Sequence, residues 1–318
     1  MVTFLGEGEI GQSRLPTPMV SVIIPCYNHG QYLDEAVHSV LEQTYQDFEI
    51  IVIDDGSTNE KTLEILETYD RPKTRLIRMS HQGLAKARNN GITACTGKYI
   101  LPLDADDKIG CTYLEKAVGV LEANERVGIV YCKAEFFGEA SGKWELPAYQ
   151  FPSILHGNVI FCSAFFRKSD WAKVNGYNPN MIYGWEDYDF WLSLIELGRD
   201  VFSIPETLFY YRKRSDSMVT MMTCEQVMYS YAQLFRNHPR LYADNMSALL
   251  VNHHDLAELV HVQDQLIKDR DQLIEDRDQL IKDRDQLMID LQSSLSWRMT
   301  KPLRYAKAVY RKCLIGRK

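Results

Sequence analysis

Three carboxylates stand close together in residues 98–107, KYILPLDADD, where Asp104, Asp106 and Asp107 directly follow a short apolar run. Ionised carboxylates are costly to bury unless a positive group neutralises them. A hard divalent cation that also holds phosphate oxygens would do so, because such cations prefer oxygen ligands. An acidic turn is the alternative, since Asp is common in turns. The stretch alone allows either reading, and the flanking sequence must decide between them.

Two further apolar runs end in polar residues of a similar kind. Residues 20–25, VSVIIP, are followed by CYN, and residues 48–53, FEIIVI, are followed by DDGS. Continuous apolar runs of this length are typical of strands that are buried on both faces. In open sheets of parallel strands, ligands bind beyond the carboxyl ends of the strands. The three polar strand ends therefore predict one binding rim and favour the metal site over the turn.

Strand and helix patterns alternate strictly over the first 130 residues, which predicts an α/β fold with a mainly parallel sheet and helices on both faces. The sequence contains neither G-x-G-x-x-G nor a P-loop, so a phosphate ligand would be held by a metal and side chains instead. We expect strands at 20–25, 48–53, 74–79, 98–103 and 127–132, and helices at 30–41, 59–69, 83–95 and 114–121.

The strict alternation ends near residue 133, and the region that follows suits an acceptor-binding half. Residues 135–155 are rich in Gly, Trp, Phe and Pro and are expected to be irregular. We expect a strand at 158–167, a short helix at 169–174, an amphipathic helix in the later part of 183–197, and two short strands at 200–205 and 207–211.

The motifs VSVIIPCYN, IIVIDDGSTN, GLAKARNNGI, ILPLDADD, GYNP and GWEDYDFWLSL occur in the order and spacing of the inverting glycosyltransferases of family 2. The chain resembles this family over about residues 20–215. The resemblance implies a Rossmann-like GT-A fold, a nucleotide-diphosphate sugar as donor, and Mg²⁺ or Mn²⁺ as cofactor. It also implies that Asp104 and Asp106 hold the metal, with Asp106 as the direct ligand and Asp104 nearer the ribose or the sugar.

The same resemblance assigns the nucleoside pocket. It implies that Asp54 and Asp55 accept hydrogen bonds from the nucleoside, a role that suits carboxylates because they only accept and their hydrogen bonds are charge-assisted. It further implies that Pro25, Tyr27 and Asn28 line this pocket. A turn that merely caps the following helix is the alternative for DDGS.

Residues at the reaction centre are also implied by the resemblance. Asp187 corresponds to the catalytic base, which a sugar hydroxyl needs because it attacks only as its proton is removed. Trp185 and Glu186 would lie on the acceptor side. Arg88 would lie near the acidic cluster or the donor, and an ion pair with a neighbouring carboxylate is the alternative role for it.

The chain departs from the family in residues 210–217, YYRKRSDS, where many relatives carry a metal-binding His and this sequence has none. Arg212, Lys213 or Arg214 could face the diphosphate, but a solvated basic loop is favoured. The third metal ligand is therefore open. The Q-x-x-R-W motif of processive synthases is also missing, which favours transfer of single sugars or short repeats.

Residues 264–291 form four near-identical heptads in which Leu266, Leu273, Leu280 and Leu287 recur at every seventh position. This period is typical of a coiled coil. The isoleucines follow the leucines directly, so the second seam position carries Asp or Arg. A self-associating coiled coil is favoured over a solvated single helix, and the sequence leaves the oligomer number open.

Residues 296–318 carry eight Lys and Arg, no acidic residue, and aromatic and apolar residues at near-helical spacing. A basic amphipathic helix of this kind fits an anionic lipid surface. Docking on the acidic domain of the same chain, or on a partner, is the alternative.

The composition narrows the class of protein. A net charge of −7 over 318 residues argues against nucleic-acid binding, and seven cysteines without a C-x-x-C pair indicate reduced thiols. No signal peptide and no membrane-spanning run are visible. We therefore expect a cytoplasmic protein, peripheral on the inner face of the plasma membrane. The expected regions are an N-terminal extension at 1–18, a GT-A domain at 19–222 with halves 19–132 and 133–222, a helical linker at 223–262, a coiled coil at 263–292 and a basic tail at 293–318.

The predicted function is metal-dependent, inverting transfer of a sugar to a growing surface glycan, such as lipopolysaccharide, capsule or exopolysaccharide, which could be linked to a lipid. A sugar-phosphate nucleotidyltransferase is the first alternative, although CYNHGQY is not the Gly-rich basic loop that such enzymes need after their first strand. A non-catalytic scaffold of a glycan synthase complex is the second.

Overall fold

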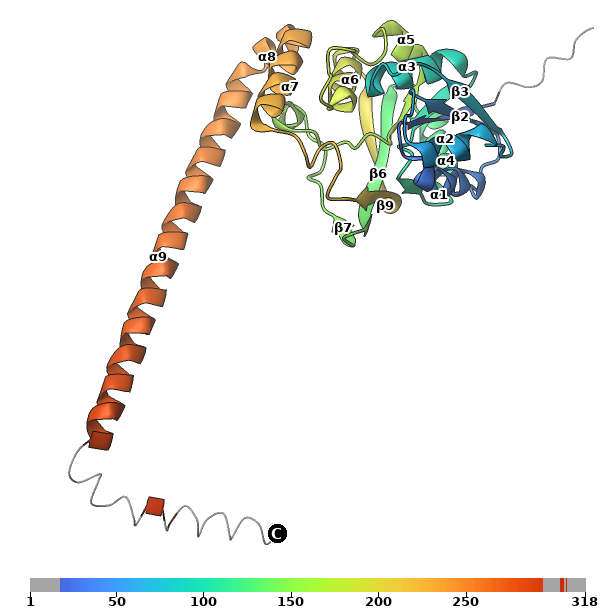
Figure 1. Ribbon diagram of the computed structural model, residues 1–318. Helices are drawn as coiled ribbons and strands as arrows, with labels where there is room; N and C mark the ends of the chain where they lie inside the picture. The colour runs from blue at the N-terminus through green and yellow to red at the C-terminus, as the bar shows by residue number, and fades with distance from the viewer. Residues whose placement is uncertain (1–17, 294–303, 306, 308–318) are drawn as a thin grey trace, which may run out of the picture. The chain divides into compact units, whose positions relative to one another are not determined.

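The computed structural model describes residues 18–293, 304–305 and 307, and the chain divides into two units after Leu249 (Figure 1). The first unit holds the sheet and the helices α1 to α8. Helix α9, Met246–Ser293, begins at the end of the first unit and supplies nearly all that is described of the second. The predicted N-terminal extension and basic tail lie almost entirely outside the described residues.

The described strands form one sheet in the order β3-β2-β1-β4-β8-β6-β9-β5, with β7 paired to β6. The strands are β1 Val20–Cys26, β2 Phe48–Asp54, β3 Thr74–Arg78, β4 Tyr99–Pro102, β5 Lys108–Ile109, β6 Val127–Gly138, β7 Gly142–Trp144, β8 Phe165–Arg167 and β9 Asp200–Lys213.

The helices of the first unit pack on this sheet and on one another. Helix α3 lies on β1 and β2, α4 on β6 and β9, and α1 against α2 and β5. The helices are α1 Gly30–Leu41, α2 Glu60–Glu67, α3 Leu84–Ala94, α4 Tyr113–Ala123, α5 Lys168–Lys173, α6 Glu186–Glu196, α7 Cys224–Asn237 and α8 Pro239–Asp244, with a 3₁₀ turn at Ser153–His156.

The parallel half of the sheet confirms the predicted α/β pattern. Strands β1, β2, β3 and β4 are mutually parallel where they pair, and every residue of β1 is buried. Cys26 lies opposite Asp54, and Ile23 lies opposite Pro102, so these three strands end at the same edge. The predicted rim of polar strand ends is therefore present.

The prediction of a mainly parallel sheet is wrong for the second half. Strand β8 lies between β4 and β6 and is antiparallel to both, and β5 and β7 also pair in the antiparallel sense. The sheet as a whole is mixed. The expected strand at 158–167 is extended in the sheet only over Phe165–Arg167, because residues 157–164 form a loop.

The two short strands expected at 200–205 and 207–211 are one long strand, β9, which runs parallel to β6. Proline usually interrupts a strand because it has no N–H to donate. Here the pairing jumps from Ile204 opposite Cys132 to Thr207 opposite Lys133, so Pro205 falls in the irregular step. The step lets β9 continue as far as Lys213, at the rim of the sheet.

Helix α9 is 48 residues long, which corresponds to about 70 Å at 1.5 Å per residue. The heptad leucines and the isoleucines that follow them are exposed on it. The heptads lie within this helix, and their pairing with a second copy stays a prediction. Among the described residues, no helix combines the length and apolar character needed to span a membrane.

Candidate active site

The loop after β2 is held by its own two carboxylates. Asp54 accepts a hydrogen bond from the amide of Ser57 at 2.9 Å. Asp55 accepts from the amides of Gln82 and Gly83, each at 2.9 Å, just before α3 begins. Both carboxylates are almost completely buried. These hydrogen bonds join the loop after β2 to the start of α3, which agrees with the alternative that DDGS forms a turn. They do not test whether Asp54 and Asp55 bind a nucleoside.

The loop after β1 is built in the same way around Asn28. This residue has a φ of 59°, in the left-handed region that Asn tolerates, and its side-chain oxygen accepts from the amides of Thr58 and Asn59 at 2.8 Å. Tyr27 beside it is 41% exposed, and its ring stacks on His81 with centroids 4.3 Å apart. The loop therefore presents an exposed aromatic ring. Pro25 is buried within β1, one residue before the strand ends.

Arg88 joins the two halves of the sheet at the centre of the site. It is fully buried in α3, donates to Asp104 Oδ1 at 2.6 Å through Nη2, and is paired with Glu186 through Nη1. Asp104 follows β4 and Glu186 begins α6. The ion-pair alternative for Arg88 is thus realised at the acidic cluster itself, where the resemblance placed it.

Asp187 lies next to this pair, in the first turn of α6. Its Oδ2 accepts from the side chain of Asn158 at 3.2 Å, and its Oδ1 accepts from the amide of Tyr188 at 2.8 Å. Burial raises the pKa of Asp187 to about 7, and the negative charges of Glu186 and Asp104 add to this, against the opposing effect of Arg88. A carboxylate that titrates near neutral pH is suited to accept a proton during catalysis.

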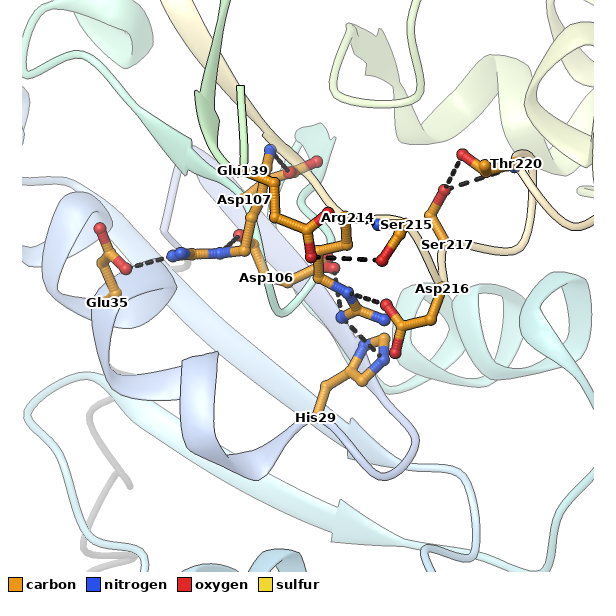
Figure 2. A network of polar contacts seen from close by, with 11 residues as sticks. His29, Glu35, Asp106, Asp107, Glu139, Arg214, Ser215, Asp216, Ser217 and Thr220 are labelled. Carbon is orange, nitrogen blue, oxygen red and sulfur yellow. Dashed lines mark hydrogen bonds and ion pairs between the residues drawn. The ribbon is translucent and has the colours of Figure 1, made fainter. Parts of the chain in front are cut away.

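Asp106 faces a different set of groups at the end of β9. Its Oδ2 lies 2.9 Å from Nη1 of Arg214, and the same nitrogen lies 3.1 Å from Nε2 of His29 (Figure 2). The prediction of a solvated basic loop is wrong for Arg214, whose side chain is only 10% exposed. Because β9 runs on to the rim as one strand, its basic end meets the acidic end of β4.

Arg212 is likewise drawn into the site. Its amide donates to Asp107 at 2.8 Å, its Nε donates to the carbonyl of Asp106 at 2.8 Å, and its guanidinium is paired with Glu35. Asp107 is buried, and its carboxylate holds the backbone of β9 at Arg212. Burial raises the pKa of Asp107 well above its usual range, with Asp106 and Asp104 adding to the effect.

The two residues assigned to the acceptor side lie at the start of α6. Trp185 has a φ of 63°, and its ring packs edge-on against Tyr231 at 4.8 Å. Glu186 is 3% exposed and its carboxylate faces Arg88, not an open surface. In this structure Glu186 therefore holds the guanidinium of Arg88 in place, and Trp185 packs at the contact between α6 and α7.

The carboxylates that could hold a divalent cation are Asp104 and Asp106. The fit is supported by Asp106, which already faces a cationic nitrogen, and by the oxygen ligands that Mg²⁺ and Mn²⁺ prefer. Asp104, Asp107 and Cys162 also bring one ligand atom each to within 4.8 Å of one another. Buried Asp107 and a thiol are poorer ligands for a hard cation, so the rim pair fits better.

The structure therefore gathers Arg88, Asp104, Glu186 and Asp187 in one cluster and places Asp106 with His29 and Arg214 beside it. Sequence reasoning missed His29, His81, Asn158 and Cys162 as site residues. His29 directly follows the motif PCYN and could have been found from its position. The other three lie in loops without a pattern that marks them.

Comparison with known proteins gives a consistent result. The model of glycosyl transferase family 2 matches residues 21–183. An uncharacterized glycosyltransferase of Haemophilus influenzae is 30% identical over 234 residues, which cover 66% of this chain and 70% of that protein. Chondroitin synthase of Escherichia coli is 30% identical over 187 residues, covering 57% of this chain and 27% of the synthase.

Solved structures agree at the level of the fold. The crystal structure of TarS residues 1–349 from S. aureus, in complex with UDP-GlcNAc, aligns with a TM-score of 0.58 and 19% identity, covering 68% of this chain and 64% of that one. The shared architecture is that of the GT-A glycosyltransferases. The family match extends over more than half of the chain and includes the strand ends and the start of the acceptor half, so this protein belongs to glycosyl transferase family 2 and is a glycosyltransferase.

Proposed function

We propose that the protein moves a sugar from a nucleotide-diphosphate donor to a hydroxyl of a growing surface glycan, with inversion at the anomeric carbon and with help from Mg²⁺ or Mn²⁺. The observation that carries the proposal is the position of Asp187. It titrates near neutral pH and is linked, through Glu186 and Arg88, to the Asp104 carboxylate at the end of β4.

Asp187 is the base in this proposal. Its carboxylate takes the proton of the acceptor hydroxyl as the oxygen attacks the anomeric carbon, and the diphosphate leaves from the opposite face. The sugar ring then passes through an oxocarbenium-like state like that of glycoside hydrolysis. Asn158 holds Oδ2 of Asp187 by a hydrogen bond, which orients the carboxylate.

The donor side is formed by the three strand ends. Tyr27 offers an exposed ring on which a base can stack, and the loops carrying Asp54 and Asp55 are already ordered by their backbone hydrogen bonds. Asp104 and Asp106 would hold the metal, which when bound stabilises the negative charge of the leaving diphosphate. The UDP-GlcNAc bound to TarS, whose fold is similar, supports a nucleotide sugar as donor.

In this proposal, the C-terminal part of the chain brings the enzyme to its acceptor at a membrane surface. The heptads of α9 pair with those of a second copy, and the basic residues after them attach the enzyme to an anionic membrane surface where lipid-linked glycans are extended. The exposed leucines of α9 support self-association. Sedimentation with vesicles of 30% anionic lipid tests the attachment, and equal sedimentation of a chain ending at residue 293 would contradict it.

A donor panel tests the reaction. Incubation with nucleotide sugars, Mn²⁺ and a lipid-linked acceptor should release nucleoside diphosphate, and NMR of the product should show the anomeric configuration opposite to that of the donor. Pyrophosphate release from a nucleoside triphosphate and a sugar phosphate would favour the nucleotidyltransferase. A product with retained configuration would contradict the role of Asp187 as the base.

A further inference from the structure

One nitrogen atom of Arg214 touches both a carboxylate and an imidazole. Its Nη1 lies 2.9 Å from Oδ2 of Asp106 and 3.1 Å from Nε2 of His29 (Figure 2). His29 comes from the loop between β1 and α1, Asp106 follows β4, and Arg214 follows β9. Three segments far apart in the sequence thus meet at one point, and the group at that point is a cation.

The chemistry of this contact fixes the state of His29. Guanidinium nitrogens can only donate, so Nε2 of His29 accepts and presents its lone pair to the position that Nη1 occupies. Asp106 presents a carboxylate oxygen to the same position. A neutral imidazole nitrogen and a carboxylate oxygen that converge on one point are a pair of ligands for a transition-metal ion.

We propose that Arg214 and a divalent cation are alternative occupants of this position, and that His29 becomes a metal ligand together with Asp106 when Arg214 withdraws. The inference rests on the proposed function for the presence of a metal. It assigns His29 as the third metal ligand, which could not be identified from the sequence because residues 210–217 contain no histidine. It also gives Arg214 a role as a built-in competitor of the metal.

Among the described residues, the side chain of Arg214 contacts only other side chains, so its withdrawal would break no hydrogen bond to the backbone of the sheet. Besides Asp106 and His29, its guanidinium contacts Asp216 at 2.8 Å, and Asp216 is 78% exposed. The guanidinium groups of both arginines lie over the ring of Tyr32, but that of Arg212 also lies over the ring of Phe137 and donates to the Asp106 carbonyl. Two positive groups cannot share one position between the same ligands, so Arg214 would have to leave this position before His29 and Asp106 could hold a divalent cation there.

The ligand set predicts which metal is preferred. Both Mg²⁺ and Mn²⁺ prefer oxygen ligands, but Mn²⁺ is a transition-metal ion and accepts an imidazole nitrogen more readily than Mg²⁺ does. We therefore expect His29 to raise the affinity for Mn²⁺ more than that for Mg²⁺. A carboxylate pair without His29 would not make this distinction.

Metal binding tests the inference without any measurement of sugar transfer. Mn²⁺ binding to the full chain is measured by electron paramagnetic resonance, first alone and then with UDP. Arg214→Gln should bind Mn²⁺ alone about tenfold or more tightly than the unaltered chain, because the competing charge is gone. His29→Ala should weaken Mn²⁺ binding by about tenfold or more and change Mg²⁺ binding less.

The double variant Arg214→Gln/His29→Ala should lose the gain of the single Arg214 variant. Arg71→Ala is the matched control. Arg71 forms an ion pair with the exposed side chain of Asp34 and contacts neither His29 nor Asp106, so this variant should bind Mn²⁺ as the unaltered chain does. Unfolding curves of each variant show whether it is folded, and Arg214→Lys, which keeps the charge, should bind Mn²⁺ no better than the unaltered chain.

Unchanged or weaker Mn²⁺ binding by folded Arg214→Gln would overturn the competition, and unchanged Mn²⁺ binding by folded His29→Ala would overturn the ligand role. Failure of the proposed function would look different, because the metal titrations would keep their pattern while no donor in the panel released nucleoside diphosphate.

Discussion

Arg88 and Glu186 form a buried ion pair across 98 positions of the sequence, and this pair joins α3 to the start of α6. Nη2 of the same guanidinium reaches Asp104. One side chain therefore neutralises a carboxylate from each half of the domain. Without it, the buried carboxylate of Glu186 and the partly exposed carboxylate of Asp104 would lose their shared positive partner.

The first prediction concerns this ion pair. Arg88→Ala should lower the free energy of unfolding by about 3–5 kcal/mol, because removal of one partner leaves buried charge uncompensated. Adding Glu186→Gln should restore part of the loss. Urea unfolding measures both, with Arg71→Ala as the control for an exposed ion pair, which should cost far less than Arg88→Ala. A loss in Arg88→Ala no larger than that of the control would show that the charges are not buried in solution.

The second prediction concerns the base. Asp187→Asn should reduce kcat by about 10²–10⁴-fold, since the amide cannot take the acceptor proton, while the Kd for donor should change little. Steady-state kinetics and donor titration separate the two effects. Asn158→Ala, which removes only the hydrogen bond to Oδ2, should cause a smaller loss. Turnover by Asp187→Asn at the normal rate would exclude this residue as the base.

The third prediction is the pH dependence. Asp187 acts only when ionised, so kcat/KM should rise with pH through about 7 and level off above it. Its pKa is raised on folding, so the stability that neutral Asp187 provides is present below about pH 4 and is lost as pH rises through about 7. Asp187→Asn should therefore gain stability relative to the unaltered chain at pH 8 and not at pH 4. A kcat/KM that is flat between pH 5 and 8 would contradict the assignment.

The fourth prediction concerns α9. Leu273→Glu together with Leu280→Glu should lower the mass measured by light scattering to that of a single chain, because these exposed leucines form the seam of the proposed coiled coil. Lys268→Glu, on the same helix, is the control and should keep the oligomer. An unchanged mass in the double variant would place self-association elsewhere, and a single-chain mass before any change would exclude it.

The parallel half of the sheet was predictable because its strands are buried on both faces and therefore read as uninterrupted apolar runs, as in residues 20–25 and 48–53. The second half of the sheet was not predictable, because β5 has two residues and β8 has three, and such short strands show no alternation of buried and exposed residues. Pro205 misled the reading of β9, because the irregular pairing that accommodates a proline depends on the neighbouring strand.

The same limit applies to the site. Asp104, Asp106 and Asp187 stand in motifs that can be read locally, and the structure places them at strand and helix ends as expected. The contact of Arg214 with Asp106 joins residues 108 positions apart, and nothing in the local sequence distinguishes a buried arginine from a solvated one. Pairings of this kind depend on the order of the strands in the sheet. That order was not predicted, because β8 lies between β4 and β6 and is antiparallel to both.

The loops of the rim are fastened by hydrogen bonds from backbone amides to Asn28, Asp54 and Asp55, whereas Tyr27 projects from the same rim with an exposed ring. Substitution of the fastening residues would alter the shape of the loops, while substitution of Tyr27 would alter mainly what they touch. The rim thus separates a fixed frame from an adjustable position, and laboratory evolution toward a different nucleotide should accumulate changes at Tyr27 and spare the frame.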